Sequence, residues 1–112
     1  MLPKINRITK KKDFDKIFKK GKGYSGDFLF LKIFKNNFSI NRFGFIISQK
    51  VSKKSTIRNK IKRRLREIIK TNLPKIKKGF DIILIIKPNA EKESFRNFKD
   101  EVQKILKRAK LI

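Results

Sequence analysis

The sequence has 112 residues, of which 33 are Lys or Arg and 9 are Asp or Glu, so its formal net charge is +24. This length predicts one domain with a single modest core, and this charge favours a polyanionic partner. No apolar run approaches the roughly 18–20 residues that span a bilayer, and we expect no secretory signal. We therefore expect no membrane partner. Because cysteine is absent, disulfides and thiolate metal sites are excluded, and we expect a cytoplasmic protein.

The N-terminal part is predicted to begin with a basic, poorly structured arm over residues 1–9 of the single domain 1–112. A short amphipathic helix follows, and its apolar residues are Phe14, Ile17 and Phe18. Gly21, which can take the left-handed conformation, is expected to end this helix. Phe14 and Phe18 lie four residues apart and share a face, a spacing that by itself is typical of core residues.

Two β-strands are predicted over residues 28–34 and 43–48, with Asn36 and Asn37 as turn residues between them. Both faces of the first strand are apolar, so we expect one face to pack under helices. The short segment 23–26 fits either a further strand or a loop.

A strongly basic helix is predicted from Ser55 onward, because apolar residues recur there at helical spacing. These residues are Ile57, Ile61, Leu65, Ile68 and Ile69. The opposite face is polar and mostly cationic, with Asn59, Lys62, Arg63, Arg66 and Lys70, while Arg58 lies at the edge between the two faces. Cations four residues apart repel by roughly 0.2–0.5 kcal/mol a pair, and cations near the helix N-terminus oppose the macrodipole. The pattern therefore indicates that an anionic partner completes this surface.

The C-terminal part is predicted to contain a buried strand over residues 80–86, after a loop over residues 72–78. Ser94 is the expected N-cap of a last helix packed on the sheet. Its apolar stripe consists of Phe95, Phe98, Val102, Ile105, Leu106 and Ala109. The order helix, strands, helix, strand, helix predicts an α/β (α+β) two-layer sandwich with a small mixed sheet.

A family resemblance appears in the basic helix, in the pattern Arg58-Asn59-x-x-Lys62-Arg63-x-x-Arg66-Glu67 with Ser48-x-Lys50-Val51 before it. This pattern resembles the RNR signature of the bacterial ribonuclease P protein subunit, and the resemblance extends over most of the chain. Gln49 stands where that family commonly has lysine, and Ser52 where it commonly has glycine. The resemblance implies an αβββαβα topology with a left-handed βαβ crossover, against the strong right-handed rule.

The resemblance also implies that the chain is a subunit of the endoribonuclease that removes the 5′ leader of precursor tRNA. The residues expected to bind the catalytic RNA are Lys50, Lys53, Lys54, Arg58, Asn59, Lys62, Arg63 and Arg66. The residues expected to line a cleft for the single-stranded leader are Phe14 and Phe18, with Leu31 at a strand position where the family often has an aromatic residue. For Phe14 and Phe18 the core and cleft roles both stay open, including one residue in each role.

No catalytic residue and no metal site are expected in the protein, because it has no His or Cys and its nine carboxylates show no convergent spacing. The resemblance implies that the RNA subunit binds Mg²⁺ and performs the hydrolysis, and no obligate protein partner is expected. The alternative is a small basic ribosomal protein that binds rRNA without a catalytic role. A sequence-specific DNA-binding protein would need a dimer surface or a recognition helix, and neither is evident.

Overall fold

The computed structural model describes residues 3–112, which form three α-helices, three short 3₁₀ segments and one four-stranded sheet. The elements are η1 (Lys4–Asn6), α1 (Lys11–Lys20), β1 (Lys22–Ser25), β2 (Leu29–Lys35), β3 (Arg42–Ile46), α2 (Ser55–Asn72), η2 (Leu73–Lys75), β4 (Phe80–Ile86), η3 (Ala90–Lys92) and α3 (Phe95–Arg108). The predicted αβββαβα order is confirmed, and the segment that fitted either a strand or a loop is strand β1.

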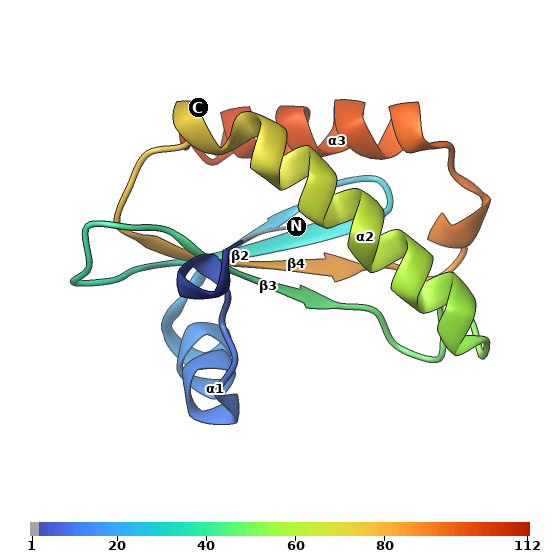
Figure 1. Cartoon of the computed structure of the whole chain (residues 1–112), viewed down its shortest axis with the longest axis horizontal. Coiled ribbons are helices and arrows are strands. Elements are labelled where there is room, and N and C mark those ends of the chain that lie inside the picture. The colour runs from blue at the N-terminus through green and yellow to red at the C-terminus, as the bar shows by residue number, and fades with distance from the viewer. Residues whose placement is uncertain (1–2) are drawn as a thin grey trace.

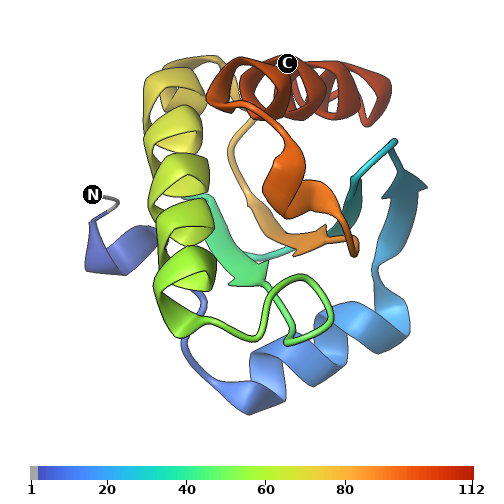
Figure 2. The same cartoon turned by 90° about the vertical axis from the view of Figure 1, so that its right-hand side faces the viewer.

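The sheet is mixed, with the strand order β1-β2-β4-β3. Strands β1 and β2 and strands β2 and β4 pair antiparallel, whereas β3 and β4 pair in parallel and are connected through α2. In Figure 1 both parallel strands run from left to right beneath α2, and Figure 2 places β4 farther from the viewer of Figure 1 than β3. The crossover from β3 through α2 to β4 is therefore left-handed, as predicted, against the general rule.

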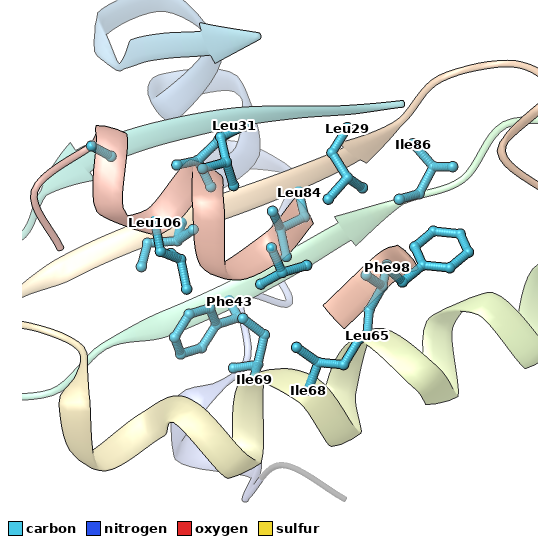
Figure 3. Close-up of a cluster of buried hydrophobic side chains, with 14 of the residues drawn as sticks. Leu29, Leu31, Phe43, Leu65, Ile68, Ile69, Leu84, Ile86, Phe98 and Leu106 are labelled. Carbon is cyan, nitrogen blue, oxygen red and sulfur yellow. The ribbon is translucent and has the colours of Figure 1, made fainter. Parts of the chain in front are cut away.

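The main core lies between the sheet and the two helices α2 and α3, which cover the same face (Figure 1). Alternate residues of β2 point into it and stand opposite alternate residues of β4, as in the pair Leu31 and Leu84. The α2 helix contributes its apolar stripe, of which Leu65 and Ile69 have no exposed surface. Figure 3 shows these side chains meeting between the two layers. The stripe thus fixes α2 on the sheet and turns its polar face outward.

The other face of the sheet is covered by α1 and by the chain before it (Figure 1). A smaller cluster lies there, with Ile8, Ile17 and Ile83 buried and with Phe14, Phe34, Ile46 and Ile85 partly buried against them. This face is less completely covered than the first, so aromatic side chains remain accessible on it.

The prediction of a poorly structured N-terminal arm is wrong for residues 3–9. Met1 and Leu2, which also belong to the predicted arm, lie outside the described residues. The Ile8 side chain is only 6% exposed, and its N–H donates to the Phe43 carbonyl at 2.8 Å. The Asn6 Nδ2 group donates to the Asn41 carbonyl at 2.7 Å. Burial of Ile8 together with these two hydrogen bonds holds the segment along the outer edge strand β3.

Gly21 ends α1 as predicted, but with an extended backbone at φ −75° and not in the left-handed region. A Cβ atom on Gly21 would lie 2.4 Å from the Ile17 carbonyl oxygen and 2.8 Å from the Ile33 carbonyl oxygen. Glycine is required here for close approach of backbone and not for a positive φ.

The last helix begins as predicted, since the Ser94 Oγ atom accepts a hydrogen bond from the Asn97 N–H at 3.1 Å. Five residues of its stripe, from Phe98 to Ala109, are buried, but Phe95 is 40% exposed. None of the helices within residues 3–112 combines the length and apolar character that crossing a membrane requires.

Candidate nucleic-acid interface

The polar face of α2 presents the residues of the RNR pattern to solvent. Asn59 and Arg63 are exposed, and Arg58, Lys62 and Arg66 are half-buried. Lys50, Lys53 and Lys54 are exposed in the turn that precedes the helix. The structure therefore brings all eight predicted residues to one helix and the turn leading into it, here called the α2 basic face.

Arg58 has a structural role within this surface. Its Nη1 group donates to the Ser52 carbonyl at 2.9 Å and to the Lys53 carbonyl at 3.0 Å. The Ser52 Oγ atom accepts from the Lys54 N–H at 3.2 Å, so the serine also supports this turn. Ser52 is not among the described residues with positive φ, and it therefore replaces the commoner glycine without backbone strain. Arg58 thus positions Lys53 and Lys54.

The cations of the α2 basic face have no carboxylate partner. Within residues 3–112 the ion pairs closer than 4.0 Å both involve Arg42, which joins Asp13 and Asp81. The positive charge of α2 is therefore compensated only by solvent, and a phosphate backbone is the kind of partner that offsets it.

Arg42 instead holds α1 against the sheet. Its Nε and Nη2 atoms donate to Asp81 at 2.9 and 2.6 Å, and its Nη1 atom donates to Asp13 of α1 at 3.3 Å. The hydrogen bond to Asp81 raises the pKa of the Arg42 guanidinium, against the opposing effect of burial. Both acceptors are thus used in positioning α1.

The aromatic residues of α1 occupy different environments. Phe18 is 39% exposed, whereas Phe14 is partly buried in the smaller cluster. A Cβ atom on Gly44 would lie 2.6 Å from the Phe14 ring, so this ring lies directly on the backbone of β3. The two roles left open by the sequence therefore separate: Phe14 supports the packing of α1, and Phe18 offers a free aromatic surface.

The prediction that Leu31 lines the cleft is wrong, because Leu31 has no exposed surface and belongs to the main core beneath α2 and α3. Side chains alternate along a strand, so Leu31 shares its face with Leu29 and Ile33. The side chains on the opposite face are Phe30, Lys32 and Phe34, all half-buried. Sequence reasoning missed Phe30 and Phe34, although the period of two from Leu29 would have identified them.

A hollow lies between the α2 basic face and the aromatic residues of α1. It is bounded by the N-terminal segment, α1, β3 and α2. Its lining residues are Arg7, Ile8, Thr9, Phe14, Phe43, Gly44, Phe45, Lys62 and Arg66. Two of these lining residues, Arg7 and Arg66, each have a buried Nε atom without a hydrogen-bond partner. Sequence reasoning also missed Arg7. The available signal was that Arg7 is the single arginine before Arg42 in a lysine-rich segment.

The described residues offer no metal site: within residues 3–112 no group of three or more Asp, Glu, His or Cys side chains could hold a metal ion. The arrangement therefore provides cations, aromatic surfaces and a hollow lined by residues of both.

Comparisons with known proteins give a consistent result. A family model described as Ribonuclease P matches residues 2–110. The ribonuclease P protein component of Pseudanabaena is 38% identical over 113 residues, covering 100% of this chain and 97% of that protein.

Two solved structures are also similar. The RNase P protein of Staphylococcus aureus superposes with a TM-score of 0.89 at 31% identity, covering 95% of this chain and 96% of that one. The RNase P protein of Thermotoga maritima superposes with a TM-score of 0.84 at 33% identity, covering 91% of this chain and 96% of that one.

Proposed function

The chain belongs to the ribonuclease P protein family, whose members act with an RNA subunit in maturing the 5′ end of tRNA, and we propose that it binds two RNAs on two different surfaces. The α2 basic face binds the catalytic RNA. The surface formed by α1 and the open face of the sheet binds the single-stranded 5′ leader of precursor tRNA.

The uncompensated charge of α2 is the observation that carries the first half of this proposal. The helix is anchored by its buried stripe, so the backbone positions from which its cations extend are fixed on the sheet. Arg63 and Arg66 have planar groups with the geometry for bidentate phosphate contact. Lys53 and Lys54 extend the same surface beyond the helix, and Arg58 maintains their turn.

The aromatic side chains of the other surface support the second half. Phe18 is exposed, and Phe30 and Phe34 lie partly accessible on the open sheet face. Stacking on such rings tolerates any base and contributes about 1–3 kcal/mol per base. The Lys16 Nζ atom lies 5.2 Å from the centre of the Phe34 ring, which adds a cation for the backbone of the strand.

The hollow beside Phe14 is suited to an RNA phosphate at the boundary between the two surfaces. Arg7, Lys62 and Arg66 meet there without any carboxylate among the lining residues. A phosphate would offset the repulsion between these three cations.

Hydrolysis belongs, in this proposal, to the RNA subunit together with the Mg²⁺ that it binds. The protein contributes by screening phosphate repulsion and by positioning the substrate. A cytoplasmic location is part of the same proposal.

Reconstitution with a bacterial ribonuclease P RNA tests the proposal. The protein should increase single-turnover cleavage of precursor tRNA at low Mg²⁺, and Arg63→Ala should weaken assembly about tenfold or more, since hydrogen bonds to charged groups contribute roughly 1.5–3 kcal/mol. Lys107→Ala, which removes one exposed cation from α3, is the matched control. No stimulation by the wild-type protein would contradict the proposed function.

A further inference from the structure

Phe95 is the one residue of the α3 stripe that the core does not use. It is the first residue of α3, and its side chain is 40% exposed while the five other residues of the stripe are buried. The packing of α3 therefore does not explain a phenylalanine at this position.

The Phe95 ring lies in a second hollow, between the start of α3 and the middle of α2. The hollow is lined by Arg63, Arg64, Arg66, Glu67 and Phe95, and its walls are mainly apolar atoms. Since four of these residues are charged, the apolar lining comes from the arginine stems and the phenyl ring. The site thus offers a flat apolar surface with cations around it.

The charges around this hollow are unpaired. None of the three arginines has a carboxylate within 4.0 Å, because the ion pairs of residues 3–112 are those of Arg42. The hollow is also continuous with the α2 basic face, with which it shares Arg63 and Arg66. Charge complementarity therefore favours a nucleic acid over a protein.

We infer that an unpaired base of the catalytic RNA stacks on Phe95, between the arginines of α2. This inference rests on the proposed function of α2. A base suits the hollow better than a phosphate, because the lining is apolar and the Glu67 carboxylate would repel an anion but accept a hydrogen bond from an exocyclic amino group. The catalytic RNA is the source because α1 lies on the opposite side of the sheet (Figure 1).

The affinity of full-length protein for a bacterial ribonuclease P RNA provides the test. Phe95→Ala should weaken binding by roughly 5- to 100-fold, the range for one stacked base. Phe95→Tyr should retain affinity because it keeps the ring face, and Phe95→Leu should lose it. Phe38→Ala is the matched control, since Phe38 is 54% exposed in the loop between β2 and β3 and should not affect binding.

Photo-cross-linking identifies the occupant. Benzoyl-phenylalanine at position 95 should form a cross-link to the catalytic RNA in the holoenzyme, and the same group at position 38 should not. Cross-linking only to precursor tRNA, or equal affinities for Phe95→Ala and wild type, would overturn the inference.

If Arg63→Ala weakens assembly and Phe95→Ala does not, the stacking site is wrong while the proposed function of α2 stands. If neither change affects assembly, the proposed function of α2 is wrong as well.

Discussion

At the scale of single residues, Phe14 and Phe18 show how one helix supplies both a packing residue and a surface residue. Phe14 lies against Ile8 and Gly44, so Phe14→Ala should destabilise the fold. Truncating a buried phenylalanine costs about 3–5 kcal/mol. We expect the lower end of this range because Phe14 is only partly buried. Phe18→Ala removes an exposed ring and should leave the melting temperature nearly unchanged. Thermal unfolding of both variants measures this difference, and an equal loss of stability in the two would contradict the separation of roles.

Arg7 gives a second residue-scale prediction. Arg7→Ala should weaken RNA binding, because a lost charge-assisted hydrogen bond costs roughly 1.5–3 kcal/mol. The melting temperature should not fall, because the guanidinium Nε atom has no partner in the protein and lies near Arg66. Lys4→Ala, an exposed cation on η1, is the control for charge alone. A lower melting temperature with unchanged RNA affinity would mean that Arg7 serves only the fold.

The sequence is a good guide to residues whose environment depends on local spacing. It identifies the buried stripe of α2 and the Ser94 cap, since both follow from contacts within one helix. It misplaces Leu31, because matching it to a family position overrode the alternation of the strand. The environment of Arg7 could not be predicted from the sequence, since it depends on contacts between segments that are distant in sequence.

At the scale of elements, the position of α1 depends on the ion pairs of Arg42. The Asp81 side chain is 5% exposed and that of Arg42 is 20% exposed. Removing one partner of a buried pair costs about 3–5 kcal/mol, so Asp81→Asn should lower the melting temperature substantially. Because the pKa of Arg42 is raised, the stabilisation from this shift is complete below the ordinary arginine pKa and should not vary near neutral pH.

The same variant tests the division of labour between protein and RNA. Asp81→Asn should leave the single-turnover cleavage rate of the saturated holoenzyme nearly unchanged once folding is confirmed. The matched carboxylate change Glu67→Gln, in an exposed residue, should do so without loss of stability. A loss of thousands-fold in rate from either change would mean that the protein supplies catalytic chemistry.

Whole elements were predicted where a strong pattern existed. Strand β4 has the predicted bounds, and α2 begins at the predicted residue. Residues 3–9 gave no such pattern, since Ile8 is their one buried apolar residue and the hydrogen bonds that attach them to the rest of the chain go to Phe43 and Asn41. A segment fixed by tertiary contacts appears as a flexible arm when only its own residues are considered.

At the scale of the whole molecule, the charge of +24 predicts a steep salt dependence. The logarithm of the affinity for the catalytic RNA should fall linearly with the logarithm of salt concentration, because each phosphate contact releases counterions. Arg63→Ala should reduce the slope by about 0.7–0.9, the value for one phosphate contact, and Phe18→Ala should leave it unchanged. Titrations at several salt concentrations measure these slopes, and a flat response would exclude the electrostatic account.

The central claim is that opposite sides of the sheet serve different RNAs, with α2 on one side and α1 on the other (Figure 1). It is tested most directly by the affinity of the assembled holoenzyme for precursor tRNA with a long leader and with a leader trimmed too short to reach α1. Phe18→Ala should weaken binding of the long-leader substrate by about 1–3 kcal/mol and leave the short-leader substrate unaffected. Equal losses for the two substrates would contradict a leader-binding surface on α1.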